Sequence, residues 1–188
     1  MSSQPVLRGV TSSGARVTLR RHADRDADAI VSAMVDPATR KWTPIPLDYD
    51  RDRALRLVSI AGDLWENGGG ARWVVADPDD TCVGMIDLNV GEGDPEAGEV
   101  FFVAAPAARG KGYITAALRA VATWALLERG LERVEWQALV GNDGSRRVAE
   151  KAGFVFEGTL RRRCPQRGER YDAWVASMIR DDLASTSI

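Results

Sequence analysis

A strand that breaks at a proline and runs through a glycine-rich basic turn into a helix constrains this chain more than any other feature. The stretch is FFVAAPAARGKGYIT, residues 101–115. Pro106 cannot continue a strand ladder because it has no N–H group. Gly110 and Gly112 let a ligand approach the backbone closely, and the first N–H groups of the helix have no intrahelical partner. Because the helix dipole favours an anion there and the turn adds an arginine and a lysine, the segment predicts a site for a phosphate-bearing ligand.

Two common phosphate-binding motifs do not fit this segment. A nucleotide-triphosphate loop places its lysine directly before serine or threonine, whereas Lys111 is followed by Gly112 and Tyr113. A dinucleotide-binding fingerprint needs a third glycine and an acidic residue at the end of the next strand. The apolar run at 134–140 ends instead in leucine and valine. Both interpretations are therefore excluded.

The order of elements after the turn points to a family. Residues 112–129 have the pattern of a helix and residues 134–140 that of a strand, and Asn142, Ser145 and a second short helix follow. In this order the chain resembles the GNAT-superfamily N-acetyltransferases. It is most similar to their RimJ/RimL-type branch, over residues 15–180.

Two segments carry this resemblance. The branch has an acyl-CoA signature of Gln or Arg, two residues, Gly, one residue, and then Gly or Ala. The segment from Arg109 to Ile114 matches it except at Ile114, which stands where the family has a small residue. The segment NDGSRRVAEKAGFVFEG, at 142–158, matches the second half of the signature. Two matches at the family's separation argue against chance.

The resemblance implies an α/β (α+β) fold. Its central sheet would be mixed and mostly antiparallel, with about seven strands flanked by about four helices, and splayed at the acyl-CoA site. Alternation and turn residues predict strands at 15–19, 72–76, 82–90, 98–103 and 134–140 and in a final hairpin. Apolar periodicity and capping residues predict helices at 24–35, 51–66, 112–129 and 145–151. Two prolines at 40–50 predict a structured loop.

Length and composition bound the possibilities. At 188 residues the chain suits one core, so we expect a single N-acetyltransferase domain at 15–188, after a small, polar and disordered leader at 1–14. With 25 basic and 27 acidic residues, net charge −2, nothing attracts nucleic acid or an anionic membrane. No signal peptide and no apolar stretch of about 20 residues is present, so we expect a cytoplasmic protein without membrane contact.

Metal and disulfide chemistry find no support in the sequence. The chain has two cysteines, Cys82 and Cys164, and a single histidine, His22. These are too few for a disulfide framework, and their spacing is not that of zinc ligands. We therefore expect no metal.

The cofactor residues follow from the resemblance. It implies that the exposed backbone of Phe102, Val103 and Ala104 pairs with the pantetheine arm of an acyl-CoA, and that Asn142 hydrogen-bonds that arm. It also implies that the turn and first helical residues hold the pyrophosphate, namely Arg109, Gly110, Lys111, Gly112, Tyr113, Ile114 and Thr115. Asn142 could instead cap the helix at 145–151, and the two roles can coexist.

The candidate catalytic residues are three. Glu99 begins the strand that feeds the glycine turn, where the family often places an acidic residue, and it could equally be a solvated strand end. Asp87, on the neighbouring strand, points into the cleft or lies on a plain polar face. Ser145 matches a serine that protonates the leaving sulfur in the RimJ/RimL-type branch, or it satisfies the first turn of a helix. Trp42 lies in the loop that covers the acceptor cleft in the family, so we expect it to contact the substrate.

The sequence thus predicts an acyl-CoA-dependent N-acyltransferase, with acetyl-CoA as donor and a primary amine as acceptor, working by direct transfer in a ternary complex. The acceptor could be a protein N-terminus or a small-molecule amine. The alternative is a non-catalytic acyl-CoA-binding regulatory module, since the base is uncertain and Ile114 departs from the family. The resemblance also allows a homodimer.

Overall fold

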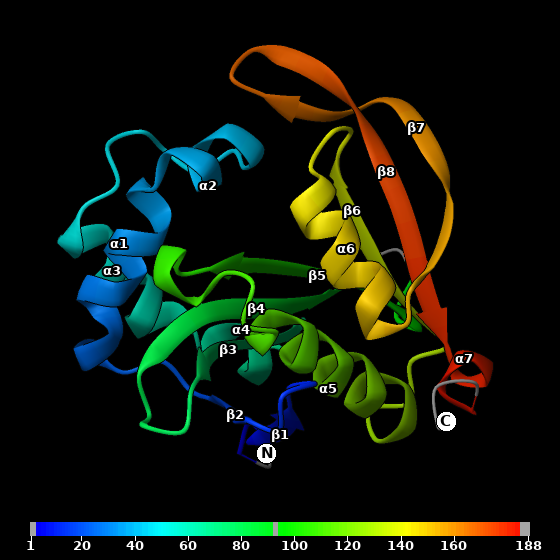
Figure 1. Cartoon of the computed structure of the whole chain (residues 1–188), viewed down its shortest axis with the longest axis horizontal. Coiled ribbons are helices and arrows are strands. Elements are labelled where there is room, and N and C mark those ends of the chain that lie inside the picture. The colour runs from blue at the N-terminus through cyan, green and yellow to red at the C-terminus, as the bar shows by residue number, and fades with distance from the viewer. Residues whose placement is uncertain (1–2, 92–93, 185–188) are drawn as a thin grey trace.

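One eight-stranded sheet organises the computed structural model, which describes residues 3–91 and 94–184 (Figure 1). The strands are β1 (Leu7–Val10), β2 (Arg16–Arg20), β3 (Gly70–Ala76), β4 (Cys82–Val90), β5 (Ala97–Ala104), β6 (Arg133–Leu139), β7 (Val155–Gln166) and β8 (Glu169–Ile179). They lie in the order β1-β2-β3-β4-β5-β6-β8-β7. Of these described strands only β5 and β6 pair in parallel, and all other neighbours are antiparallel. The prediction of a mixed, mostly antiparallel sheet is confirmed, with one strand more than expected.

Helices lie on both faces of this sheet. They are α1 (Ala27–Val35), α2 (Pro37–Trp42), α3 (Arg51–Ile60), α4 (Asp63–Glu66), α5 (Tyr113–Leu127), α6 (Asp143–Ala152) and α7 (Arg180–Ala184), with 3₁₀ turns η1 (Asp24–Asp26) and η2 (Pro106–Ala108). α5 and α6 pack on one face, whereas α1 and α3 pack on the other (Figure 1). Among the described residues, no helix combines the length and the apolar character needed to cross a membrane.

The main core lies between the sheet and α5. Strand alternation turns Ile86 and Leu88 of β4 and Val100 of β5 toward this helix, and all three are buried. Helical spacing brings Leu118 and Val121 of α5 onto the same layer. Burying each such side chain stabilises the fold by about 1.5–3 kcal/mol.

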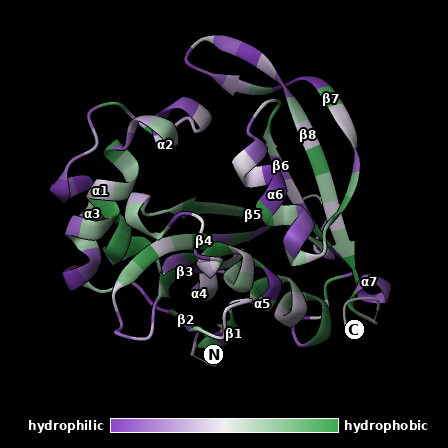
Figure 2. Cartoon of the chain, viewed as in Figure 1, coloured by the Kyte–Doolittle hydropathy of each residue, from purple (hydrophilic) through white to green (hydrophobic). Residues whose placement is uncertain are grey.

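The second face is covered only in part. Met85 of β4 packs there against Ile30 of α1 and Ala54 of α3. Beyond these helices the face is open, and Phe101 of β5 is 48% exposed although it lies in the interior of the sheet. Figure 2 shows polar residues along α3 and at the tip of the β7–β8 hairpin, and apolar residues along β5. An open and partly apolar surface is therefore left beside β5.

Strand β1 corrects the expectation of a disordered leader over residues 1–14. Leu7 pairs with Leu19 of β2 and is 8% exposed, and the indole of Trp73 donates a 2.9 Å hydrogen bond to the carbonyl of Pro5. At Gly9 an added Cβ would lie 2.9 Å from the carbonyl oxygen of Ala116, so β1 packs directly on α5. Four residues around a glycine give too short an alternation to predict a strand. Residues 1 and 2 lie outside the described residues.

Two helix boundaries also differ from expectation. The helix predicted at 51–66 is two helices, α3 and α4, which are separated by a turn at Ala61 and Gly62. The loop predicted at 40–50 begins inside α2. Pro37 does end α1, as expected, but it also occupies the first turn of α2, where proline is favoured because its missing N–H is not needed.

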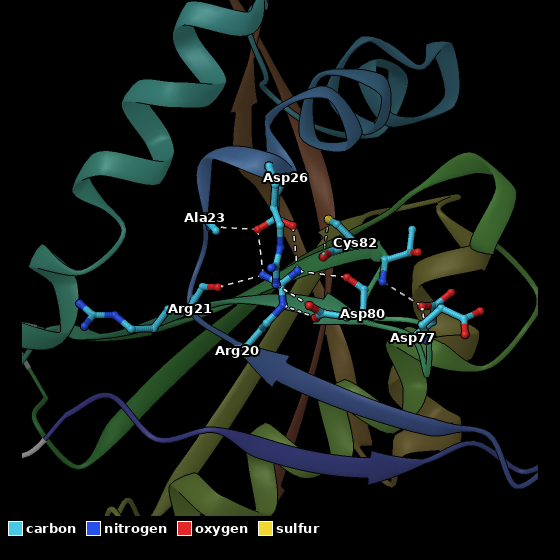
Figure 3. Close-up of polar contacts among 11 residues, drawn as sticks. Arg20, Arg21, Ala23, Asp26, Asp77, Asp80 and Cys82 are labelled. Atoms are coloured by element: carbon cyan, nitrogen blue, oxygen red, sulfur yellow. Dashed lines mark hydrogen bonds and ion pairs between the residues drawn. The ribbon is translucent and has the colours of Figure 1, made fainter.

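An arginine-centred network ties the end of β2 to the β3–β4 turn (Figure 3). Arg20 donates two hydrogen bonds of 2.8 Å to the carboxylate of Asp26 and one of 2.6 Å to Asp80. Asp26 also accepts the N–H of Ala23 at 2.9 Å and is buried. The network fixes η1, and with it the start of α1.

Candidate active site

The site begins where β5 and β6 separate. Their parallel pairing runs from Ala97 with Arg133 to Val100 with Trp136 and then ends. Within the described residues the rest of β5, at 101–104, continues without a strand partner on that side, and Figure 1 shows β6 and β8 turned away from β5. The expected splay is present and starts one residue before Phe102. It leaves a row of backbone groups that can pair with an extended ligand.

A cleft of about 1440 Å³ opens at this separation. It lies between the glycine turn, the β1–β2 turn, α2 and the start of α6. The predicted residues that line it are Phe102, Val103, Ala104, Arg109, Gly110, Lys111, Gly112, Tyr113, Ile114, Thr115, Asn142, Ser145 and Trp42. Two of the predicted residues, Glu99 and Asp87, are not part of its lining.

The glycine turn presents unpaired N–H groups to the cleft. Gly110 and Gly112 have φ of 76° and 81°, in the left-handed region that glycine adopts without strain. Within the described residues the N–H groups of Tyr113, Ile114 and Thr115 find no backbone acceptor, as expected for the first turn of a helix. The turn therefore suits the pyrophosphate of CoA.

The departure at Ile114 is accommodated by the core. Ile114 is 6% exposed, and a Cβ added to Gly84 of β4 would lie 2.6 Å from its Cδ1. Gly84 thus makes room for the isoleucine inside the sheet. The larger side chain consequently points into the core and does not obstruct the turn.

The charge of Arg109 is paired at the start of α2. Its guanidinium donates to the carboxylate of Asp36 and, at 3.0 Å, to the hydroxyl of Thr39, both at the start of α2. This hydrogen bond from Arg109 lowers the pKa of Asp36. The charge of Arg109 is therefore paired, whereas Lys111, which also lines the cleft, forms no ion pair with a described residue.

Further cations line the cleft that we did not single out from the sequence. They are Arg119 of α5 and Arg147 and Lys151 of α6. Arg119 also donates a 3.1 Å hydrogen bond to the carbonyl of Lys151, which ties α5 to the end of α6. The β1–β2 turn residues 11–13, also in the lining, were missed with β1.

Asn142 and Ser145 form the corner of the cleft at the start of α6. The Oδ1 of Asn142 accepts the N–H of Ser145 at 3.2 Å, so Asn142 caps the helix. Its side-chain NH₂ group remains available as a donor. The Oγ of Ser145 accepts a 3.0 Å hydrogen bond from the indole of Trp136, which is 2% exposed. The hydroxyl proton of Ser145 can therefore serve another acceptor.

Glu99 and Asp87 lie on the second face of the sheet, away from α5. Glu99 is placed beside Glu135 in the parallel register, and its side chain makes no hydrogen bond or ion pair with the described residues. Burial, with the negative charge of Glu135, raises its pKa. Asp87 forms an ion pair with Arg72 at 3.2 Å, and burial raises its pKa to about 6. Asp87 is thus occupied by a structural partner, whereas Glu99 is not.

Beside the separation point, one predicted group lies on each face of the sheet. Trp136 pairs with Val100, and Ser145 lies against Trp136 on the face of α5 and α6. Glu99 directly precedes Val100 and therefore projects from the other face. The hydroxyl of Ser145 and the carboxylate of Glu99 therefore lie on opposite faces of the sheet.

Trp42 closes the cleft opposite α6. Two of its ring carbons lie 3.5 and 3.9 Å from the position of a Cβ added at Gly141, and the Nζ of Lys41 lies 4.5 Å from its ring centre.

Among the described residues, no group of three or more histidine, cysteine or acidic side chains gathers to hold a metal.

Comparison with known families identifies this arrangement. The family model of the acetyltransferase (GNAT) domain matches residues 16–155. The chain belongs to the GNAT acetyltransferase family. This GNAT chain is 24% identical over 166 residues to YoaA of Bacillus subtilis (strain 168), an uncharacterized N-acetyltransferase, and the match covers 88% of this chain and 94% of YoaA. It is 36% identical over 102 residues to YdaF of the same organism, provisionally named a ribosomal N-acetyltransferase, over 54% of this chain and 56% of YdaF.

Solved GNAT structures share the fold. Mycobacterium smegmatis RimJ in complex with CoA-disulfide superposes with a TM-score of 0.82 at 22% identity, over 95% of this chain and 89% of RimJ. The microcin C7 self-immunity acetyltransferase MccE, in complex with acetyl-CoA and AMP, gives 0.77 at 17% identity, over 87% and 92%. The chain is accordingly a GNAT N-acetyltransferase.

Proposed function

We propose that this enzyme acetylates a primary α-amine by direct transfer, with Glu99 as the base and Ser145 as the proton donor to sulfur. The observation that carries the proposal is their placement on opposite faces of the sheet at the point where β5 and β6 separate. Acetyl-CoA supplies the activated acetyl group as a thioester. The amine then approaches from the face of Glu99, and the thiol leaves on the face of Ser145.

Glu99 suits the role of base because it is half-buried and unpaired among the described residues. Its raised pKa makes it a stronger base than a solvated glutamate. Asp87 remains a second candidate, but its ion pair with Arg72 competes with proton transfer. Glu99 takes the proton that the amine nitrogen loses as it bonds to the acetyl carbon.

A carboxylate base favours an α-amine over a lysine side chain. Near pH 7.4, deprotonating a lysine amine with pKa ~10.4 costs about 4 kcal/mol, whereas an α-amine with pKa ~7.8 costs about 0.5 kcal/mol. A glutamate is too weak a base to offset the free energy of about 4 kcal/mol that deprotonation of a lysine requires. A protein N-terminus or an amino-acid-like molecule therefore fits this site better than a lysine does.

Ser145 suits the role of proton donor because Trp136 already donates to its oxygen. The proton of Ser145 is then available to the leaving sulfur, and the serine oxygen would regain a proton from solvent water while Glu99 releases the one it took from the amine. A thiol has a pKa of ~8.5 and leaves readily, so this donor contributes less than the positioning of the reactants.

The cofactor residues enter the proposal as a group. The N–H groups of the glycine turn would hold the pyrophosphate, the unpaired edge at 102–104 would pair with the pantetheine, and the NH₂ of Asn142 would donate to it. Lys111 would add positive charge beside the phosphates.

The likeness in fold to RimJ supports a place in the RimJ/RimL-type branch. We also propose a cytoplasmic location.

Thiol release from acetyl-CoA tests the proposal directly. The purified protein is offered N-terminal peptides, free amino acids, lysine peptides with a blocked N-terminus, and polyamines, and product masses are recorded. We expect release with α-amines at a kcat/KM at least tenfold above that with blocked lysine peptides, because the difference in deprotonation cost of about 3.5 kcal/mol corresponds to a factor of up to about 400. Turnover with polyamines or lysines alone would overturn the α-amine assignment. No turnover despite CoA binding would contradict the catalytic roles.

A further inference from the structure

The short helix α2 is held at its start by the glycine turn. Asp36, the N-cap of α2, accepts the N–H of Thr39 at 2.9 Å, and the same carboxylate oxygen accepts the guanidinium of Arg109. Arg109 also donates to the hydroxyl of Thr39. The side chain of Asp36 is 15% exposed and that of Arg109 is 38% exposed. Arg109 of the glycine turn therefore hydrogen-bonds to Asp36, the N-cap residue of α2, which lies 73 positions earlier in the chain.

The end of α2 is held by the tip of the β7–β8 hairpin. Gln166 is buried and donates a 3.0 Å hydrogen bond to the carbonyl of Lys41. Arg167 donates at 3.2 Å to the carbonyl of Thr43 and at 3.4 Å to that of Ile45. Figure 1 shows this hairpin arching toward α2. The bonds to Lys41 and Thr43 take up carbonyls that the end of a helix leaves unsatisfied, and the bond to Ile45 holds the loop that follows.

Between its two attachments, α2 forms one wall of the cleft. Ala38, Thr39 and Trp42 line it, and Trp42 lies against Gly141 on the opposite wall. The placement of Trp42 thus depends on both attachments. The attachment through Arg109 is the one that starts from the cofactor turn.

The charge of Arg109 is already used in this contact. A carboxylate in direct hydrogen bond with a guanidinium cancels most of its attraction for a second anion. The N–H groups and Lys111 remain for the pyrophosphate. From these contacts we propose that Arg109 is a positioning residue, which fixes α2 and Trp42 on the amine side of the cleft through Asp36, and is not a ligand of the CoA phosphates. The part concerning the amine rests on the proposed function.

Two single variants and their combination test this assignment. Asp36→Asn removes the charge but keeps a side chain that can cap α2, since asparagine is as good an N-cap as aspartate. Arg109→Gln removes the guanidinium. Asp48→Asn is the matched control, because it breaks the Asp48–Arg53 ion pair in the following loop without touching α2. Melting temperatures verify that each variant is folded.

Amide hydrogen exchange of the free protein gives the first readout and needs no activity. We expect exchange in residues 38–43 to accelerate about three- to tenfold in Asp36→Asn and in Arg109→Gln. The double variant should match the singles, because both remove the same contact. The control should match the unsubstituted protein. An unchanged exchange in Asp36→Asn would overturn the proposal.

CoA calorimetry and amine kinetics give the second readout. We expect the Kd for CoA to stay within about twofold in both variants, while the amine KM rises roughly three- to tenfold. If Arg109→Gln weakens CoA binding tenfold or more and Asp36→Asn does not, Arg109 is a phosphate ligand and the proposal fails. If no amine is acetylated by any form, the proposed function fails, and exchange with calorimetry still judges the role of Arg109.

Discussion

The indole Nε1 of Trp136 donates a 3.0 Å hydrogen bond to the hydroxyl oxygen of Ser145. The donor is almost fully buried in β6, and the acceptor stands at the start of α6 on the wall of the cleft. Because an indole N–H can only donate, the serine oxygen must accept here. The serine oxygen is therefore engaged from inside the core, and its proton is left for another acceptor.

Replacing Trp136 by Phe should lower kcat about two- to tenfold with little change in either KM. The variant keeps most of the ring but loses one hydrogen bond, which is worth about 0.5–1.5 kcal/mol. Ser145→Ala should lower kcat further, by about 10²-fold. This is the lower end of the range for acid–base catalysts, and we expect it because a thiol leaves readily. Steady-state kinetics of both variants measure these effects.

The double variant separates a role through Ser145 from a general packing defect. With Ser145 already alanine, the change at Trp136 should have no additional effect on kcat. An equal additional loss in the double variant would show that Trp136 acts only through packing.

Gly112→Asp should abolish measurable CoA binding while the protein stays folded. The new side chain would place a negative charge beside the N–H groups of the turn, where the pyrophosphate is expected. Gly112 has φ of 81°, so any other residue costs about 1 kcal/mol of stability there. Calorimetry with CoA and thermal unfolding measure the two effects separately.

Gly130 supplies a matched control for that variant. It has the same φ of 81°, an added Cβ would meet open space there, and it follows the far end of α5. Gly130→Asp should therefore lose similar stability and keep its affinity for CoA. Equal loss of binding in both variants would remove the phosphate site from the turn.

Glu99→Gln should lower kcat/KM about 10²-fold and remove the acid limb of its pH profile. At low pH the raised pKa keeps Glu99 protonated and unable to accept a proton, so the rate of the unsubstituted enzyme should rise as pH passes that pKa. Glu135→Gln should keep the limb but move it to lower pH, since the charge of Glu135 raises the pKa of Glu99. An intact limb in Glu99→Gln would exclude Glu99 as the base.

Glu157 should contribute to the free energy of unfolding at neutral pH and lose this contribution in acid. Its hydrogen bonds from Arg133, and a 2.8 Å bond from Ser177, hold its pKa at about 2, so the contribution is complete above the ordinary value of about 4.5 and lost as pH falls toward 2. Because the side chain is 37% exposed, solvent screening limits the effect to about 1 kcal/mol. Urea unfolding of Glu157→Gln should show this loss at pH 7 and none at pH 2. An equal loss at both would refute the electrostatic origin.

The elements around the cofactor cleft were predictable because each carries a strong local signal. Pro106 stops a strand, Gly112 needs a left-handed backbone, and apolar residues repeat along α5. These signals depend on neighbours in the chain, so they survive without knowledge of the tertiary structure. The same holds for Asn142, whose capping role follows from the helix behind it.

The contacts that the sequence could not reveal are long-range. Nothing near Arg109 indicates that its side chain pairs with Asp36, because the two come together only when the sheet has formed. Strand β1 has four residues and acquires its meaning from pairing with β2 and from packing on α5. The engagement of Asp87 by Arg72 likewise depends on the register of β3 with β4.

The short parallel contact between β5 and β6 makes the cleft a weak seam in an otherwise continuous sheet. Four residue pairs join these two strands, against seven on each outer side of them. A ligand with amide groups lying along residues 101–104 would hydrogen-bond to the edge of β5 that no described strand pairs with, and would join the two halves of the sheet. Binding of such a ligand should therefore raise the melting temperature of the protein. At a ligand concentration of about 100 times Kd, the free energy of unfolding rises by about 2.7 kcal/mol.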